Sequence, residues 1–240
     1  CHSQPLADER REGAWRAALA PYFAEWHIDA HSLAAGAGRA PFSMALADLI
    51  RPFRPPVVSF HFGLPQPALL AAVKSWGATV LSSATTVDEA LWLQEHGADV
   101  VIAQGLEAGG HRGHFLSADL TLQQGSLTLL PQIVNAIRLP VVAAGGIADA
   151  RGIAAALALG AAGVQVGTAY LLCHEASTST LHRQALASPA ARHTALTNLM
   201  TGRPARGIVN RLMRELGPLN ALAPQFPLAT AALAPLRAAA

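Results

Sequence analysis

The chain has 240 residues, of which 52% are hydrophobic, so it can bury one sizeable core and a single domain is the default expectation. Only 13% of the residues are charged and the formal net charge is +2, which disfavours nucleic acid as a partner. No apolar run is long enough for a membrane span and no signal peptide opens the chain, so we expect a soluble, cytoplasmic protein. Cys1 and Cys173 are too few for a disulfide framework or a cysteine metal site, and we expect no metal.

The first 55 residues are predicted to be helical and irregular. Apolar residues at helical spacing favour a helix over residues 5–26. Residues 31–44 have no clear period and are interpreted as an irregular loop that leads into a short helix, Met44 to Pro52. Because the chain starts with Cys1 and its last segment, 231–240, has no helix stop signal, we expect a fragment of a longer protein.

From Pro56 onward, short apolar strands alternate with helices. This rhythm is typical of βα units, which form parallel sheets with right-handed crossovers. A closed (β/α)8 barrel needs eight units, of which five are visible, and the fingerprint of an open dinucleotide-binding sheet is absent. The fold class is therefore predicted as α/β, a partial (β/α)8 TIM barrel. The strands are expected at 57–61, 78–82, 99–103, 140–144 and 163–166, and the helices at 66–75, 87–96, 124–137 and 149–159.

We expect the chain to divide into three parts. Residues 1–55 form the helical and irregular segment, residues 56–175 form the barrel strands and helices, and residues 176–240 form a C-terminal helical segment. Within this last part, residues 180–190 are predicted to be a surface helix and residues 201–211 a loop that enters a helix.

The most informative segment is a glycine-rich loop directly after the third strand. It reads Gln104-Gly-Leu-Glu-Ala-Gly-Gly-His-Arg-Gly113. Glycines let the backbone pass close to a ligand, and the loop places His111 at the carboxyl end of a strand, where barrel active sites lie. His111 is therefore the catalytic candidate, against the alternative of a structural or surface histidine. The Gln104 amide suits the polar edge of a flat heterocycle, or else it ties down the loop by bonding its backbone.

The next two strands also end in glycine or a small polar residue. Gly145 and Gly146 follow one of them, and Gly167 and Thr168 follow the other. Adjacent strand ends of this kind, with a helix that begins near Asp149, match the phosphate site of (β/α)8 barrels. The N–H groups of Gly146, Gly167 and Thr168 are expected to converge on phosphate oxygens. The alternative is that these glycines only make tight turns.

Other polar residues at the strand ends are weaker candidates. His61 and Ser83 are predicted to contact the substrate. The alternatives are that His61 fills the upper layer of side chains inside the barrel and that Ser83 only bonds the backbone of a turn. Glu107 is expected to pair with Arg112 across the loop. The other histidines are expected on the surface: His2, His27, His31, His96, His114, His174, His182 and His193.

The motifs together resemble a known family. Gln104–Gly113, Pro140–Asp149 and Val164–Thr168 resemble the nitronate monooxygenases, also called 2-nitropropane dioxygenases, and Val58–Gly63 and Gly202–Arg211 look like the same family. The resemblance runs from about Val57 to Glu215. It implies an FMN-dependent (β/α)8 barrel that oxidises alkyl nitronates with molecular oxygen and releases a carbonyl compound and nitrite. The last five units of that barrel are the ones present.

The resemblance also implies site residues. His111 would be the active-site histidine, which holds the nitro or nitronate group or takes a proton from a neutral nitroalkane. The family's first three strands and its late C-terminal segment have no counterpart here, which is expected to leave an open barrel edge and an incomplete flavin pocket. The residues implied to contact FMN are Gln104, Gly109, Gly145, Gly146, Gln165, Val166, Gly167 and Thr168.

Two alternatives stay open. An FMN-dependent enoyl-thioester reductase of fatty acid synthesis shares a similar Glu-Ala-Gly-Gly-His loop, although the stretch Arg203–Arg211 favours the monooxygenase. A non-catalytic barrel that binds a phosphate ligand fits the phosphate loops, but it leaves His111 and Gln104 without a task.

Overall fold

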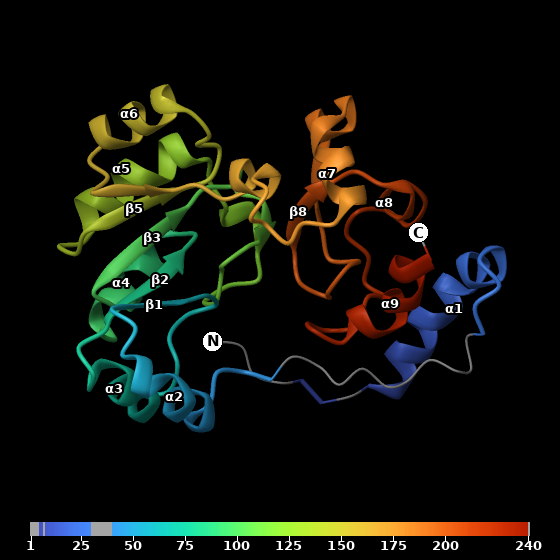
Figure 1. Ribbon diagram of the computed structural model, residues 1–240, viewed down its shortest axis with the longest axis horizontal. Coiled ribbons are helices and arrows are strands. Elements are labelled where there is room, and N and C mark those ends of the chain that lie inside the picture. The colour runs from blue at the N-terminus through green and yellow to red at the C-terminus, as the bar shows by residue number, and fades with distance from the viewer. Residues whose placement is uncertain (1–4, 7, 30–39, 240) are drawn as a thin grey trace. The chain divides into compact units, whose positions relative to one another are not determined.

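The computed structural model describes residues 5, 6, 8–29 and 40–239, which form two compact units (Figure 1). One unit, Pro41–Leu186, holds the parallel strands, and we call it the sheet unit. The other combines Ser3–Ala40 with Ala187–Ala240, and we call it the terminal unit. The contacts thus divide the chain differently from the three ranges expected: residues 41–55 belong with the strands, and the first helix belongs with the C-terminal segment.

The sheet unit contains the five predicted strands in one parallel sheet. The strand order is β1-β2-β3-β5-β6, with parallel pairing at every step. Because the strands are parallel and in chain order, all their carboxyl ends lie along one edge of the sheet. The strands are β1 (Val57–Phe60), β2 (Thr79–Ala84), β3 (Val100–Gln104), β5 (Val141–Ala144) and β6 (Gly163–Gln165).

Helices connect the strands, and polar N-cap residues in the sequence mark where two of these helices begin. Thr86 caps one helix by accepting a hydrogen bond from Glu89 N at 3.2 Å, and Asp149 caps another by accepting one from Gly152 N at 2.9 Å. The four helices predicted between the strands are confirmed to within two residues at each end. They are α3 (Pro67–Lys74), α4 (Val87–Glu95), α5 (Ser126–Ala136) and α6 (Ala150–Ala158), preceded by α2 (Met44–Ile50) and a 3₁₀ turn, η2 (Arg51–Phe53).

The core of the sheet unit lies between the strands and helices α4 and α5. Val101, Leu93, Leu129 and Ile133 are fully buried there. Apolar strands that are covered by helices read as continuous hydrophobic runs, which explains why the sequence revealed them. β1 lies at the edge of the sheet and its Val57 is exposed.

The rest of the sheet unit consists of short elements in the loops. They are β4 (Gly110–His111), the 3₁₀ turns η3 (Leu120–Leu122) and η4 (Thr168–Leu172), and α7 (Thr180–Ala187). The Arg183 guanidinium fixes the segment before α7, since it donates hydrogen bonds to the carbonyls of Leu172, Cys173, Ala176 and Thr178 at 2.6 to 3.1 Å.

The terminal unit is built around the first helix. Trp15, Leu19 and Phe23 are buried on α1 (Glu9–Glu25), and the Trp15 ring N–H donates to the carbonyl of Ala229 at 3.3 Å. The unit also contains a β-hairpin. Its other elements are η5 (Pro189–Arg192), β7 (Thr194–Thr197), β8 (Ala205–Ile208), α8 (Arg211–Leu216) and α9 (Ala229–Ala239).

This hairpin corrects the prediction for the C-terminal segment. Residues 201–211 were expected as a loop entering a helix, but Ala205–Ile208 form β8, which pairs antiparallel with β7. The segment 176–240 is therefore not only helical. Both strands have four residues and β8 is half-buried throughout, so neither shows the alternation that marks a strand in a sequence. Most of the irregular loop predicted over 31–44 lies outside the described residues.

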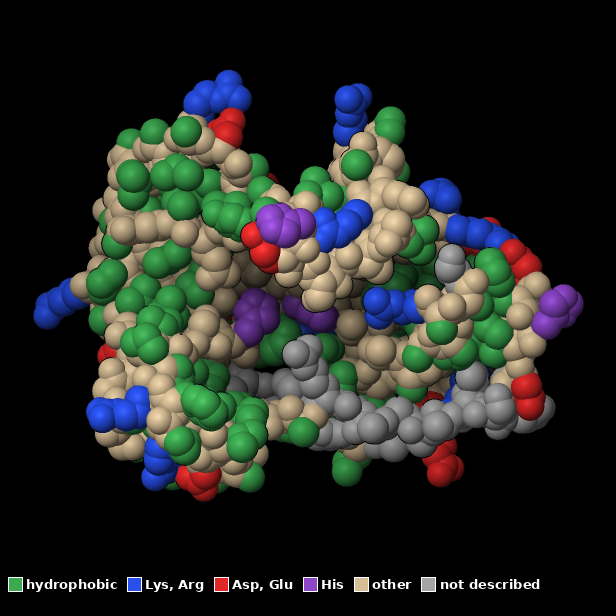
Figure 2. Space-filling model, viewed as in Figure 1, with side chains coloured by type: hydrophobic (Ala, Val, Ile, Leu, Met, Phe, Trp, Pro, Cys, Tyr) green, Lys and Arg blue, Asp and Glu red, His purple; other side chains and the backbone are tan. Residues whose placement is uncertain are grey.

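Charged residues make up 13% of the sequence and are scattered on the face drawn in Figure 2. On the face that Figure 2 shows, Lys, Arg, Asp and Glu side chains lie singly or in small groups separated by apolar and uncharged surface. Among the described residues, no helix has the length and apolarity needed to cross a membrane, and no group of three or more His, Cys, Asp or Glu side chains is placed to hold a metal ion.

A network of charged side chains links α1 and α8 in the terminal unit. Tyr22 donates its O–H to Glu215 at 2.7 Å, and Arg211 bonds both Glu215, at 2.8 Å, and Glu25, at 2.7 Å. Burial, and then the hydrogen bond to the Glu215 carboxylate, raise the pKa of Tyr22 from 10.0 to about 12.

This raised pKa predicts a pH effect on stability. The neutral phenol is favoured in the folded state, so its contribution is fully present below pH 10 and is lost as the pH rises through about 12. The free energy of unfolding of the Tyr22→Phe variant is therefore expected to be lower than that of the unsubstituted protein at pH 8 to 9, by roughly 0.5 to 1.5 kcal/mol, and the difference should shrink above pH 10. Urea unfolding of both proteins across this range checks it, and a constant difference would contradict it.

Candidate active site at the carboxyl edge of the sheet

The predicted site residues lie at the carboxyl edge of the parallel sheet, on segments of the sheet unit. Gln104 is the last residue of β3, Gly145 directly follows β5, and Gln165 is the last residue of β6. The register aligns these ends, with Gln104 opposite Ala144 and Ala144 opposite Gln165. The loops that leave neighbouring strands therefore start side by side.

Three of these loops approach each other so closely that only glycine fits. A Cβ atom built on Gly109 would lie 2.8 Å from Thr168 Oγ1, and one built on Gly145 would lie 2.9 Å from Ala108 N. Real Cβ atoms essentially never come within 3.0 Å of such neighbours. The loop after β3 thus contacts the loop after β5 and the loop after β6, and a side chain at either glycine would push them apart.

Glu107 holds two of these loops against the start of α5. Its carboxylate accepts hydrogen bonds from the backbone N–H of Ser126, at 2.9 and 3.1 Å, and lies 2.9 Å from Ser126 Oγ. The same hydroxyl lies 2.8 Å from the carbonyl oxygen of Gly145. Gly146, with φ +71°, packs beside the Glu107 side chain. Glu107 therefore has a structural role, as the sequence suggested, but through Ser126 rather than through the pairing expected with Arg112.

Gln104 ties the glycine-rich loop together. Its amide N–H donates to the carbonyl of His111 at 3.0 Å, and its amide oxygen accepts from the N–H of Gly113 at 2.7 Å. The side chain is buried. The loop-tying alternative is thus what the contacts show, while the FMN contact of Gln104 stays a prediction.

His61 and Ser83 meet at the same point. The ring of His61 has Nδ1 3.0 Å from Ser83 Oγ and Nε2 3.3 Å from the carbonyl oxygen of His111. A carbonyl only accepts, so Nε2 carries a proton and, in the neutral ring, Nδ1 accepts from the Ser83 hydroxyl. A Cβ on Gly113 would lie 2.9 Å from the His61 ring, so this glycine makes room for the histidine.

His111 is half-buried, and its carbonyl is held by both His61 and Gln104. Its ring lies edge-on to Phe62, with the ring centroids 6.0 Å apart and an interplanar angle of 85°. Phe62 has φ +67° and Gly63 has φ +77°, so the chain after β1 turns sharply next to this ring. The carbonyl of His111 is therefore held by two side chains, while the residue as a whole stays half-buried.

The end of β6 leaves open space of the kind that a ligand needs. A Cβ on Gly167 would meet no atom within 4 Å, and Gly167 and Thr168 are exposed. Gly167 is the N-cap of η4 and Thr168 is its first residue, and backbone N–H groups in this first turn have no partner within the helix. Val166 is half-buried and Gln165 is exposed.

The N-terminus of α6 has fewer free N–H donors for a phosphate than the sequence suggested. The Asp149 carboxylate already occupies it by accepting from Gly152 N, and this hydrogen bond, together with Arg151 at 2.8 Å, lowers the pKa of Asp149. A carboxylate at the helix N-terminus competes with a phosphate for the same N–H groups. The donors at this edge are therefore those of the glycine turns.

Sequence reasoning missed a set of buried polar residues beside the glycine-rich loop. Arg112, Glu89, Thr85 and Gln123 are 0%, 1%, 0% and 9% exposed and are hydrogen-bonded to one another in a chain. Thr86 and Glu89 have the spacing of a capping box. This pattern could have indicated that Glu89 is hydrogen-bonded at the start of a helix. The Glu89 carboxylate instead binds Thr85 and the backbone of Phe115 and Leu116.

The prediction that the remaining histidines lie on the surface holds for most of them. His114 is the exception, because it is 6% exposed. It directly follows the glycine-rich loop, and residues 112–114 are all buried. The exposed ones are His27, His96, His174, His182 and His193, while His2 and His31 lie outside the described residues.

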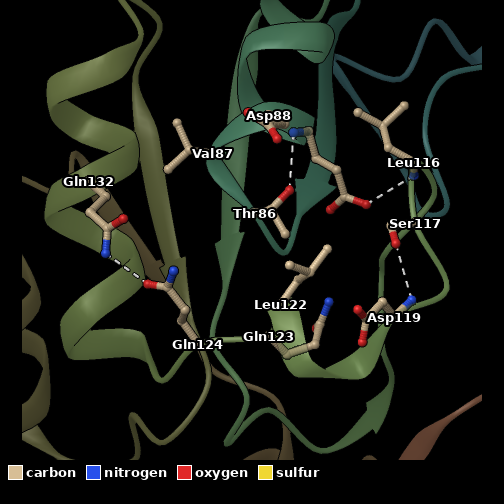
Figure 3. A pocket seen from close by; sticks show the side chains of 11 residues that line it. Thr86, Val87, Asp88, Leu116, Ser117, Asp119, Leu122, Gln123, Gln124 and Gln132 are labelled. Atoms are coloured by element: carbon tan, nitrogen blue, oxygen red, sulfur yellow. Dashed lines mark hydrogen bonds between the residues drawn. The ribbon is translucent and has the colours of Figure 1, made fainter.

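A cavity of about 390 Å³ lies elsewhere in the sheet unit. Its walls come from the start of α4, with Val87 and Asp88, and from the loop 116–124, with Leu116 and Leu122 (Figure 3). None of the predicted site residues lines it, so it is separate from the candidate active site.

Known proteins resemble this chain over most of its length. A family model described as nitronate monooxygenase matches residues 17–240. The nitronate monooxygenase of Pseudomonas aeruginosa is 43% identical over 231 residues, which cover 95% of this chain and 64% of the relative. A probable nitronate monooxygenase of Bacillus subtilis is 45% identical over 168 residues, covering 70% and 48%. The chain therefore spans about half to two thirds of the length of these curated relatives.

Solved structures agree with the sequence comparison. A crystal structure of nitroalkane oxidase from Streptomyces ansochromogenes matches with a TM-score of 0.87 and 40% identity, covering 98% of this chain and 67% of that one. FabK from Thermotoga maritima matches with a TM-score of 0.62 and 31% identity, over 74% and 54%. The predicted fold class is confirmed: the sheet unit carries five βα units of a (β/α)8 barrel. The chain belongs to the nitronate monooxygenase family.

Proposed function

We propose that the complete protein is an FMN-dependent monooxygenase that oxidises alkyl nitronates with molecular oxygen to a carbonyl compound and nitrite. The observation that carries this proposal is the meeting of three loops at Gly109, Gly145 and Thr168, with a half-buried His111 in the first of them. Membership of the nitronate monooxygenase family supports it. The nitroalkane oxidase structure favours neutral nitroalkanes as further substrates.

The residues at this edge fit FMN. The open space beside Gly167 and the exposed start of η4 would receive the phosphate, which the N–H groups of Gly146, Gly167 and Thr168 would hold. No dinucleotide fingerprint is present to bind a second, adenosine half, which favours FMN over FAD. The other residues proposed to contact the cofactor are Gln104, Gly109, Gly145, Gln165 and Val166.

His111 is proposed to act on the substrate. The residues at this edge would hold FMN, which would supply the redox chemistry between the nitronate and oxygen. The imidazole would hold the nitro group against this cofactor, and it would remove the α-proton of a neutral nitroalkane, since imidazoles exchange protons readily near neutral pH. The two hydrogen bonds to its carbonyl, from Gln104 and His61, keep the residue in place for either role.

His61 and Ser83 are proposed to border the substrate. Both ring nitrogens of His61 are engaged, one with Ser83 and one with the carbonyl of His111. Its contribution is therefore to shape the pocket and hold His111 rather than to take a proton.

The reactants proposed are a small-molecule nitronate and oxygen, with neither nucleic acid nor a membrane as partner. The small share of charged residues in the sequence, 13%, supports the first exclusion. We propose a cytoplasmic location, because two cysteines in 240 residues are typical of a reduced compartment.

Anaerobic reduction of the flavin tests this function. Propionate 3-nitronate, added without oxygen to the complete flavin-loaded protein, is expected to bleach the flavin absorbance, and admitting oxygen should restore the absorbance and release nitrite. NAD(P)H is the control and should bleach it slowly.

The alternatives give other outcomes. Rapid bleaching by NAD(P)H and none by the nitronate would favour the FMN-dependent enoyl-thioester reductase, the alternative that shares a similar Glu-Ala-Gly-Gly-His loop. Bleaching by neither would favour a barrel that only binds a phosphate ligand.

A further inference from the structure

A buried chain of four hydrogen-bonded side chains lies next to the glycine-rich loop. Arg112 Nε donates to the Gln123 amide oxygen at 2.9 Å, and the Gln123 amide N–H donates to Thr85 Oγ1 at 2.8 Å. The Thr85 hydroxyl donates in turn to the Glu89 carboxylate at 2.8 Å. Every hydrogen bond points the same way, from a cation to an anion.

The donors and acceptors at the two ends of this chain fix the orientation of the two side chains between them. Gln123 must present its oxygen to Arg112 and its nitrogen to Thr85, and Thr85 must accept on one side and donate on the other. Chains of this kind polarise each other in a low-dielectric interior, so each bond strengthens the next. Two buried charges of opposite sign at the two ends compensate each other through the two neutral links.

The two ends of the chain hold the two ends of the loop that carries His111. Arg112 donates to the carbonyls of Gln104, at 2.9 Å, and Gly105, at 2.7 Å, where the loop leaves β3. Glu89 accepts from the N–H groups of Phe115, at 2.5 Å, and Leu116, at 3.2 Å, just after the glycine-rich loop ends. His111 lies in the sequence between these anchor points.

We propose that the hydrogen-bonded chain Arg112–Gln123–Thr85–Glu89 positions His111. In this proposal the Thr85 hydroxyl couples Arg112 and Glu89, which hold the two ends of the loop. The part of this inference that concerns turnover rests on the proposed function. The part that concerns the loop does not. Thr85 is fully buried and is proposed to act through the loop, so it is a positioning residue.

The test compares two variants of Thr85 in the complete protein. Thr85→Val keeps the shape of the side chain but removes the hydroxyl, which breaks the chain and leaves the buried Gln123 N–H without its acceptor. Thr85→Ser keeps the hydroxyl and loses one methyl group. Glu95→Gln, at the exposed end of α4, controls for changes in the helix itself. If Thr85→Val fails to fold, Gln123→Met breaks the same chain one link further on.

Two measurements are independent of the substrate. Hydrogen–deuterium exchange of residues 105–116 is expected to be at least about tenfold faster in Thr85→Val than in Thr85→Ser, because the loop loses the coupling of its anchors. The titration of the His111 ring, followed by NMR on protein with isotope-labelled histidine, should shift in the valine variant and return in the serine variant.

The third measurement is turnover of the nitronate at full flavin occupancy. Thr85→Val should lower kcat by about tenfold or more, since small displacements of a reacting group can cost up to about 10²-fold. The same substitution should have little further effect in a His111→Ala background, because its effect passes through His111. A merely structural residue would lower both backgrounds alike.

The outcomes separate this proposal from the proposed function. Unchanged loop exchange and His111 titration in Thr85→Val, or equal losses of kcat with and without His111, would overturn the positioning role. Faster exchange and a shifted titration in a protein that oxidises no nitronate would support the positioning role while the proposed function fails.

Discussion

Replacing His111 with alanine is expected to leave FMN bound and to lower turnover by about 10²- to 10⁴-fold, the usual contribution of an acid or base group. The cofactor should stay because the N–H groups proposed to hold its phosphate belong to other loops, at Gly146, Gly167 and Thr168. Flavin content from the absorbance spectrum and steady-state kinetics of the complete protein measure both effects. His182→Ala, an exposed histidine on α7, is the matched control and should behave like the unsubstituted protein.

The two forms of one substrate then separate the possible roles of His111. If the imidazole acts as the base, the variant should lose oxidation of the neutral nitroalkane but keep part of its activity on the preformed nitronate, which needs no deprotonation. If it orients the nitro group, activity on both forms should fall alike. Undiminished activity on both would remove His111 from the site.

The second large effect is expected at Gly167. Gly167→Asp should lower FMN affinity by at least about 10²-fold, because a carboxylate beside a phosphate is repelled by about 4 kcal/mol per unit charge at 4 Å and an effective dielectric constant of 20. Gly167→Ala is the control, since a Cβ at this position meets no atom within 4 Å and the residue does not have a positive φ. Flavin titration by fluorescence quenching measures both variants.

Gly167 gives a cleaner test than Gly146. Gly146 has φ +71°, and a Cβ there would lie 3.3 Å from Glu107, so any substitution strains the turn whether or not a phosphate binds. If Gly167→Asp kept a full complement of flavin while remaining folded, the phosphate would have to bind elsewhere.

The parallel sheet could be predicted from the sequence because its strands are short apolar runs that recur with helices between them. Strands β3 and β5 are buried or half-buried along their whole length, and such apolar runs stand out in any sequence. The hairpin at 194–208 could not, since its half-buried strands alternate too weakly. Nor did the pattern of residues 5–26 indicate that their apolar face packs on α9, because amphipathicity names a buried face but not its partner.

Some features of the candidate site could likewise be predicted from the sequence, and others could not. The glycines at 109 and 145 could be anticipated, since closely spaced loops need residues without a side chain. That His61 and Gln104 share the carbonyl of His111 could not, because backbone acceptors leave no trace in the sequence. The buried chain from Arg112 to Glu89 was missed for a related reason: charged residues are read as exposed unless their partners are known.

The make-up of the terminal unit has a consequence for synthesis on the ribosome. α1 buries Trp15, Leu19 and Phe23 in a cluster completed by Leu199, Met213 and Leu233, so roughly 200 residues are translated between the helix and its last partner. At a synthesis rate of about 5 to 20 residues per second, the apolar side chains of α1 are made about 10 to 40 s before the last residues that bury them. The described strands of the sheet unit all lie within one continuous stretch that is translated during that interval. We therefore expect α1 to remain without its full hydrophobic cover for longer than the described helices of the sheet unit do.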